Sequence, residues 1–145
     1  MMPTRSQIIA AARGWIGTPY RHQAACKGAG SDCLGLVRGV WLEIYVVAPE
    51  QPPPYTPDWG EAGAVEHILA AAHRNMAAIE LAQARGGDVI VFRMREGRIA
   101  KHMAILTSEA TMIHAQSNDR VREIAFAPYW RRHAVAAFQF PGLAD

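Results

Sequence analysis

The chain has 145 residues, half of them hydrophobic, and a formal net charge of +2. This length and composition suit one compact domain over residues 1–145 and leave little room for a second. The small net charge argues against nucleic acid as a partner. No apolar run is long enough to cross a bilayer, so no membrane insertion is expected, and residues 1–20 lack the continuous apolar stretch of a secretory signal.

The beginning of the chain has the pattern of a helix. Ile8, Ile9, Ala12 and Ile16 recur at helical spacing, and Gly14 is a signal for the end of the helix. We therefore expect a first helix whose apolar stripe includes Ile16.

A polar, glycine-rich loop over 21–31 leads to a second expected helix over 33–46, for which Ser31 or Asp32 is the natural N-cap. The segment 49–59 contains five prolines, so it can be neither a regular helix nor a central strand. It predicts an extended loop, anchored by aromatic side chains at its end.

The alanine-rich residues 61–84 predict a third helix that ends at Gly86. After that point the pattern changes to short β-rich runs, with a turn at 95–98 and a loop or short helix at 128–132. Helices followed by strands indicate an α+β domain in which N-terminal helices pack on an antiparallel sheet. The strands are expected over 88–93, 102–107, 111–115, 121–126 and 134–140.

Cys33 is the first candidate for chemistry, because it stands where the second helix is expected to begin. The unpaired N–H groups and positive dipole end of a helix N-terminus favour the thiolate, which is the reactive form of cysteine. We therefore expect a lowered pKa for this thiol. The alternative is a buried cysteine that acts as a small hydrophobic side chain.

His102 and His114 lie on neighbouring expected strands. If 108–110 form a three-residue turn, Thr107 faces Thr111, and His102 then lies diagonally across from His114 on the same face of the hairpin. A slip of one residue would separate the two faces. A thiol with two aligned histidines predicts a thiol hydrolase, in which an imidazole is the base and a second polar group orients it.

Two other uses of the cysteines remain open at this point. Cys26 and Cys33 could form a disulfide, although this would consume the candidate nucleophile. His22, Cys26, Cys33 and His102 could hold zinc, although their spacing matches no common structural zinc motif. The favoured interpretation needs neither a metal nor a cofactor.

Several short segments occur in an order that resembles the NlpC-type cell-wall peptidase family, within the papain-like cysteine peptidases. The likeness spans residue 8 to about residue 140. Its segments are Gly17-Thr18-Pro19-Tyr20, Ser31-Asp32-Cys33-Leu34-Gly35-Leu36, Gly87-Asp88-Val89-Ile90-Val91-Phe92, Lys101-His102-Met103-Ala104-Ile105 and Met112-Ile113-His114-Ala115.

The resemblance implies a catalytic set of Cys33 as nucleophile, His102 as general base and later acid, and His114 as the orienting residue. It implies hydrolysis of the stem peptide of peptidoglycan, commonly between D-glutamate and the diamino acid, without a cofactor. Tyr20 matches a tyrosine near the thiol that helps to bind the acyl oxygen, and Asp32 is the second candidate for this substrate or oxyanion site.

Three segments resemble more specifically the branch found in phage, prophage and gene-transfer-agent tail clusters. They are Arg21-His22-Gln23, where many relatives have Trp-Gly-Gly, the end of the proline-rich loop at 55–59, and Phe92-Arg93-Met94-Arg95. This branch implies a virion or tail-tip component with tail or baseplate proteins as partners. Such a protein is made in the cytoplasm without a signal peptide and acts on the cell wall. The alternatives are a thiol amidase or acyltransferase on another amide or ester, and a catalytically silent tail-tip protein.

Overall fold

The computed structural model describes residues 2–45, 67–94 and 102–145. The proline-rich loop expected at 49–59 and the turn expected at 95–98 lie outside the described residues, as does the start of the expected third helix. Within the described part of the chain, no helix combines the length and apolar character that a membrane span needs.

The element order alternates little: helices dominate the first half and strands the second. The helices are α1 (Arg5–Arg13), α2 (Cys33–Ile44), α3 (His67–Asn75) and α4 (Pro128–His133), with a 3-10 turn η1 (Leu81–Gln83). The strands are β1 (Ala25–Cys26), β2 (Gly30–Ser31), β3 (Ala77–Ile79), β4 (Val89–Phe92), β5 (His102–Leu106), β6 (Thr111–Ala115), β7 (Val121–Ala125) and β8 (Ala134–Gln139).

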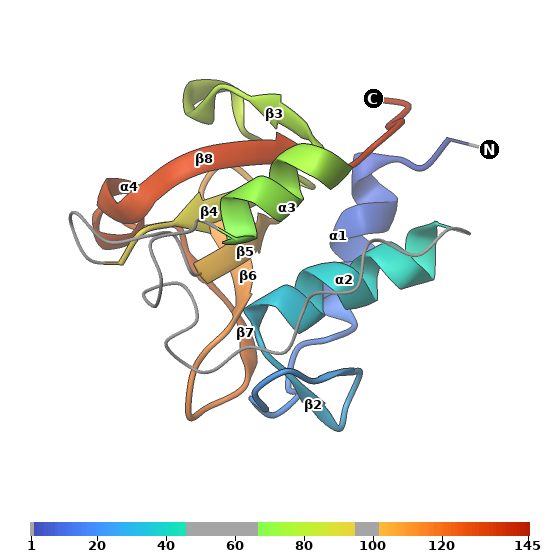
Figure 1. The fold of residues 1–145 in the computed structure, drawn as a ribbon, viewed down its shortest axis with the longest axis vertical. Coiled ribbons are helices and arrows are strands. Elements are labelled where there is room, and N and C mark those ends of the chain that lie inside the picture. Colours follow the sequence, from blue (N-terminus) through green and yellow to red (C-terminus); the bar gives the residue numbers. More distant parts are fainter. Residues whose placement is uncertain (1, 46–66, 95–101) are drawn as a thin grey trace.

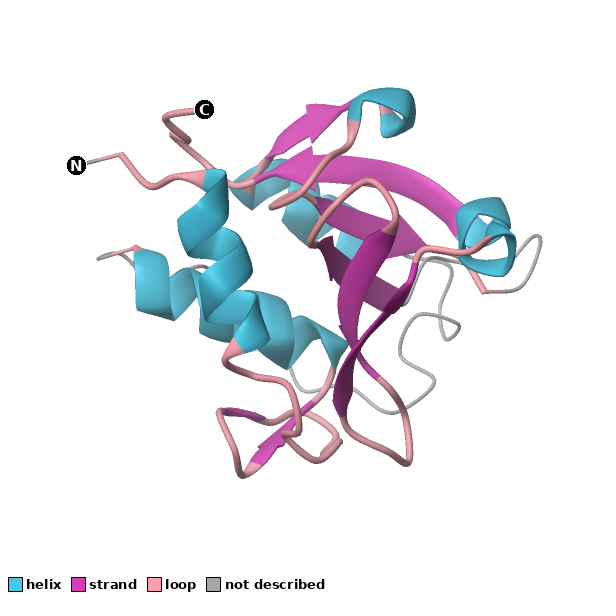
Figure 2. Ribbon diagram, turned by 180° about the vertical axis from the view of Figure 1, so that it is seen from behind, coloured by secondary structure: helices cyan, strands magenta, loops and turns pink. Residues whose placement is uncertain are grey.

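The main sheet has the strand order β3-β8-β4-β5-β6-β7, and all of its neighbouring strands are antiparallel. Figures 1 and 2 show α1 and α2 side by side next to this sheet, and β1 and β2 form a separate hairpin below them. The expected α+β arrangement of N-terminal helices on an antiparallel sheet is therefore confirmed.

Side chains alternate across the sheet and form two apolar clusters. On the helix side, residues such as Val91 and Ile105 pack with the buried faces of the helices. On the opposite side, residues such as Phe92 and Leu106 pack with Phe126 and with partly buried Trp130 of α4. The sheet is thus covered by α1, α2 and α3 on one face and by α4 on part of the other.

Helix α1 begins with a capping box: the Thr4 hydroxyl accepts from the Gln7 N–H, and the Gln7 side chain accepts from the Thr4 N–H. The helix ends at Arg13, earlier than the apolar pattern indicated. Beyond that end the chain no longer follows helical spacing, so Trp15 is buried, whereas Ile16 is 45% exposed. The inclusion of Ile16 in the apolar stripe was wrong.

Helix α2 lies very close to its neighbours at two glycines. A Cβ on Gly35 would overlap the carbonyl oxygen of Ala24, and one on Gly39 would overlap the indole of Trp15. The same indole donates its N–H to Glu43, 3.0 Å away. The glycine positions therefore let the preceding loop and Trp15 pack directly on the helix backbone.

The third expected helix is shorter than predicted. The described part of it, α3, ends at Asn75, and residues 77–79 form β3, which pairs with β8. Alanine favours a helix. Residues 77–79 instead form backbone hydrogen bonds with the edge of β8, and this pairing outweighs the helix preference. The helix prediction for 76–84 was wrong for this reason.

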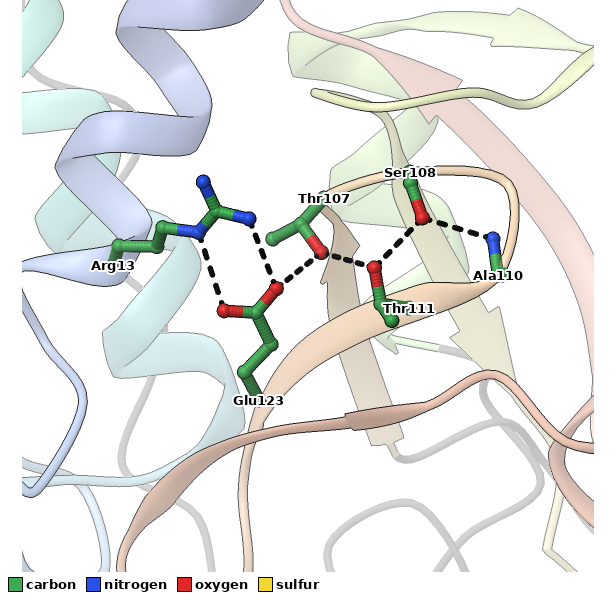
Figure 3. Close-up of polar contacts among 6 residues, drawn as sticks. All are labelled: Arg13, Thr107, Ser108, Ala110, Thr111 and Glu123. Atoms are coloured by element: carbon green, nitrogen blue, oxygen red, sulfur yellow. Dashed lines mark hydrogen bonds and ion pairs between the residues drawn. The ribbon is translucent and has the colours of Figure 1, made fainter.

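Polar contacts tie α1 to the sheet at two places. In Figure 3, Arg13 pairs with Glu123 of β7, and Glu123 also accepts from the Thr107 hydroxyl at 2.7 Å. This network continues into the turn between β5 and β6 through Thr111. At the other end of α1, Arg5 pairs with the fully buried Asp88 at 2.7 Å.

Candidate active site

The thiol of Cys33 lies at the first residue of α2, as predicted. Asp32 is the N-cap, and its Oδ1 accepts from the Gly35 N–H at 2.7 Å. Its Oδ2 accepts from the Gln23 N–H at 2.8 Å. One buried carboxylate therefore holds both the helix start and the preceding loop, which fixes the backbone at the sulfur.

Gln23, in the loop before α2, has an unusual backbone conformation. Its φ is 62°, in the left-handed region that favours glycine. A glutamine adopts this conformation here, and its N–H is bonded to Asp32 Oδ2. This hydrogen bond therefore holds the loop to the start of the helix.

The two histidines meet across the β5–β6 hairpin. Ile105 pairs with Ile113 and Leu106 with Met112, which is the register expected for the turn at 108–110. His102 Nε2 lies 3.0 Å from His114 Nδ1, and the two rings are nearly perpendicular. The prediction of a same-face histidine pair is confirmed. His114 is 1% exposed, so its ring is fixed within the sheet's second apolar cluster.

The sulfur reaches the start of the same strand. The backbone N–H groups of Met103, Leu34 and Cys33 all act on the sulfur and favour its thiolate by lowering the pKa of Cys33. Met103 follows His102 directly, so α2 brings the thiol to the residue next to the imidazole. Nε2 of His102 faces His114, so the other ring nitrogen, Nδ1, is the candidate for proton exchange with a substrate or the thiol.

Burial dominates the pKa of the thiol. The pKa of Cys33 is raised to about 12, mainly by burial and then by the negative charge of Asp32. The N–H groups at the helix start lower it, as expected, but they are outweighed. The predicted lowering of the pKa of Cys33 is therefore wrong.

Burial also disfavours charge on the histidines. It lowers the pKa of His102 to about 3, with repulsion from His114 as the second cause. It lowers the pKa of His114 to about 4, against a smaller opposing effect of Asp119. A single charge on His102 or on His114 is thus disfavoured. A proton passed from Sγ of Cys33 to Nδ1 of His102 would instead create two opposite charges together.

Tyr20 lies beside the thiol, as predicted. Its backbone N–H donates to the Asp119 carbonyl at 2.9 Å, and its main chain bridges to Ser31. Burial raises the pKa of its phenol to about 12, followed by the charges of Cys33 and Asp32. The phenol is therefore a protonated donor near the sulfur at neutral pH. The oxygens of Asp32 serve the helix cap, and its role toward substrate stays a prediction.

Sequence reasoning did not single out Trp130. Its ring centroid lies 5.7 Å from that of His102 and 5.0 Å from that of His114. The only local signal is a large aromatic side chain directly after Pro128-Tyr129 in a short segment, and such a signal does not indicate which residues the ring contacts.

The two alternative uses of the cysteines are not assembled. Cys26 and Cys33 are both free thiols, and Cys26 is exposed on β1. Across residues 2–45, 67–94 and 102–145, no group of three or more His, Cys, Asp or Glu side chains is arranged to hold a metal ion. The residues proposed for zinc, His22, Cys26, Cys33 and His102, therefore do not form one site.

Comparison with known proteins gives a consistent set of relatives. The model of the NlpC/P60 family matches residues 17–139. Among curated proteins, the murein DD-endopeptidase MepH of Escherichia coli (strain K12) is 27% identical over 124 residues, which cover 84% of this chain and 41% of the relative. The chain therefore spans less than half of that protein.

Solved structures share the fold. A family protein from Bacillus cereus superposes with a TM-score of 0.69 at 20% identity, over 97% of this chain and 41% of its own. The NlpC/p60 domain of the peptidoglycan hydrolase SagA superposes with a TM-score of 0.64 at 24% identity, over 94% of this chain and 99% of the domain. The expected papain-like, NlpC-type fold is thereby confirmed.

Proposed function

Because this chain belongs to the NlpC/P60 family, we propose that it is a cysteine peptidase that hydrolyses the peptide part of peptidoglycan. This is a family of cysteine peptidoglycan hydrolases, which agrees with the enzyme class expected from the sequence. The observation that carries the proposal is the His102–His114 hydrogen bond of 3.0 Å. It lies at the start of β5, where the N–H of Met103 acts on Cys33 Sγ.

In the first step, Cys33 Sγ attacks the carbonyl carbon of the scissile amide while its proton moves to Nδ1 of His102. His114 accepts from the Nε2–H of His102 and so keeps the proton-free nitrogen turned toward the thiol. We assign the Tyr20 hydroxyl and the Cys33 backbone N–H as the donors to the carbonyl oxygen as it becomes negative.

In the second step, His102 returns the proton to the leaving amine nitrogen, the C–N bond breaks, and a thioester on Cys33 remains. Water then attacks the thioester and gives its proton to His102, which returns it to the sulfur as the acid product leaves. The enzyme ends with a neutral thiol and a neutral imidazole, the state that burial of both groups favours.

For the bond, we retain the D-glutamyl–diamino acid linkage of the stem peptide, which the sequence resemblance implies. The name of the relative MepH specifies a DD-endopeptidase acting on murein, so a bond between two D-centres is the competing candidate. The two cuts leave different products, because the first gives a new amino terminus on the diamino acid and the second separates cross-linked stems.

The test is digestion of purified peptidoglycan, with the soluble fragments identified by mass spectrometry. We expect wild type to release peptide fragments, Cys33→Ala to release none, and Cys26→Ala, which removes the exposed thiol, to match wild type. Equal fragments from Cys33→Ala would overturn the proposal. Hydrolysis of simple amides or esters that needs Cys33, without any release from peptidoglycan, would favour the thiol amidase or acyltransferase instead.

For delivery, we propose that the protein reaches the cell wall as part of a phage-like tail tip, with tail or baseplate proteins as partners. The support is the resemblance of 21–23, 55–59 and 92–95 to the tail-associated branch. Purified particles should then contain the protein in a fixed ratio to tail proteins. Particles with Cys33→Ala should assemble normally and enter walled cells poorly. Absence of the protein from particles would overturn this delivery route.

A further inference from the structure

The indole of Trp130 packs against both rings of the histidine pair. Its plane is tilted by 31° to the His102 ring and by 72° to the His114 ring. It also meets Phe92 edge to face at 5.4 Å, and Phe92 in turn contacts His102 at 5.7 Å. His102 is therefore bounded by two aromatic rings on the side of the sheet away from α2.

Trp130 is itself firmly held. It lies on α4, where the next residue, Arg131, donates to the carbonyls of Phe126 and Glu109 at 2.8 and 2.6 Å. The Arg131 guanidinium also covers the Phe126 ring at 4.4 Å. Tyr129, 51% exposed, meets the indole edge to face on its outer side. These contacts fix a short helix that has no side-chain cap of its own.

A cover of this kind has a specific effect on an imidazole–imidazole hydrogen bond. Such a bond is stronger where water and its high dielectric are kept away. Edge-to-face ring contacts also restrict rotation of the rings about Cβ–Cγ. When His102 carries the proton during a reaction, the indole face lies within the distance at which a cation is stabilised by an aromatic ring.

We propose that Trp130 is a positioning residue that covers the His102–His114 hydrogen bond, keeps water from it and holds the His102 ring in this orientation. Its effect on turnover rests on the function proposed above, whereas its effect on the hydrogen bond does not. The indole acts through His102 and makes no contact with substrate in this role.

The test compares Trp130→Ala, Trp130→Leu, which keeps apolar volume without a ring, and Trp130→Phe, which restores a ring. Ile79→Ala is the control, because Ile79 of β3 packs against the same apolar cluster and is not one of the residues that hold α4. For each folded variant, proton NMR follows the ring N–H shared by the histidines and its exchange with water. Steady-state kinetics on peptidoglycan peptides give kcat and KM.

We expect wild type, Trp130→Phe and Ile79→Ala to keep a slowly exchanging ring N–H, and Trp130→Ala and Trp130→Leu to lose it. In the last two, kcat should fall by about tenfold to a hundredfold, with KM changed less than about twofold. A slowly exchanging N–H in Trp130→Leu would overturn the proposal, as would a rise in KM at constant kcat. Wild-type protein that shows the protected N–H but no hydrolysis would contradict the proposed function and leave the NMR comparison decisive for Trp130.

Discussion

Two polar pairs of this sheet are buried to a similar degree and behave in opposite ways. Asp88 accepts from Arg5 at 2.7 Å through Oδ1 and from the Arg85 N–H at 3.0 Å through Oδ2. The same Arg5 nitrogen also donates to the Gly86 carbonyl. His102 and His114 are two like groups joined by one hydrogen bond, and burial lowers the pKa of both.

The difference lies in how charge is compensated. The Arg5–Asp88 pair unites opposite charges whose remaining hydrogen-bonding positions are also used, so it fastens α1 to the start of β4. The histidine pair offers no opposite charge within itself, so a proton on it is held weakly and can be passed on. The comparison indicates that a saturated buried pair stabilises the fold, whereas an uncompensated pair is suited to chemistry.

The largest expected effect comes from substitutions in the histidine pair. His102→Ala should abolish measurable turnover, because general acid–base catalysis typically contributes about 10²–10⁴-fold. His114→Gln should keep a folded enzyme with a partial loss, because glutamine can still accept from His102. The kcat of each variant on peptidoglycan peptides checks this, with the exposed His73→Gln as control. Full activity in His114→Ala, which removes the acceptor altogether, would contradict the orienting role.

The second-largest expected effect comes from substitutions in the Arg5–Asp88 pair. Asp88→Ala removes the buried carboxylate that pairs with Arg5 and leaves its guanidinium only the oxygens of Gly86 and Asp145, so the free energy of unfolding should fall by about 3–5 kcal/mol. The double variant Arg5→Met with Asp88→Leu should lose less, because no buried charge remains. Urea unfolding measures both values, and kcat per folded molecule should not change. A larger loss in the double variant would show that the pair itself is strongly stabilising.

Acid should expose the histidine pair as a weakness of the fold. The pKa of His114 is about 4 in the folded state and 6.5 as a free side chain, so unfolding takes up a proton between these values. Stability is therefore retained above pH 6.5 and lost as the pH falls toward 4, by roughly 3 kcal/mol for this group. Chemical denaturation across this range checks it, and the slope with pH should be smaller in His114→Gln. An unchanged slope would mean that other groups cause the acid sensitivity.

The smallest effect concerns the network in Figure 3. Thr107→Val removes the hydroxyl that donates to Glu123 and contacts Thr111. We expect a loss of about 0.5–1.5 kcal/mol in the free energy of unfolding, since one hydroxyl is replaced by a methyl of similar size. The kcat should stay at the wild-type value. A marked fall in kcat would indicate that the β5–β6 turn helps to position the histidines, in addition to its contact with the Arg13–Glu123 pair.

The sequence predicted those features that depend on local chemistry. The helix start at Cys33 follows from an adjacent capping carboxylate, and the register that joins His102 to His114 follows from one short turn. Features that depend on the assembled molecule were missed or wrong. The end of α3 is set by the edge of β8, and the contact of Trp130 with the histidines requires α4 to be placed over the sheet.

The direction in which the pKa of Cys33 is shifted is the clearest example of a feature that depends on the assembled molecule. The helix N-terminus acts in the direction that was expected, but burial and Asp32 act against it and prevail. Burial is a property of the whole fold, and no pattern around residue 33 reports it. The pattern at an isolated helix start therefore places Cys33 correctly at the first residue of α2 but gives an incomplete account of its ionisation.

The two glycines of α2 set a limit on how this enzyme can be altered by directed evolution. At Gly35 and Gly39 even a methyl group would overlap the loop carbonyl of Ala24 or the ring of Trp15. A library that varies these positions would push the helix, and the sulfur at its first residue, out of place by a distance that matters for catalysis. New substrate preferences are better sought in the exposed loop residues such as Arg21, while the helix that begins at Cys33 is left unchanged.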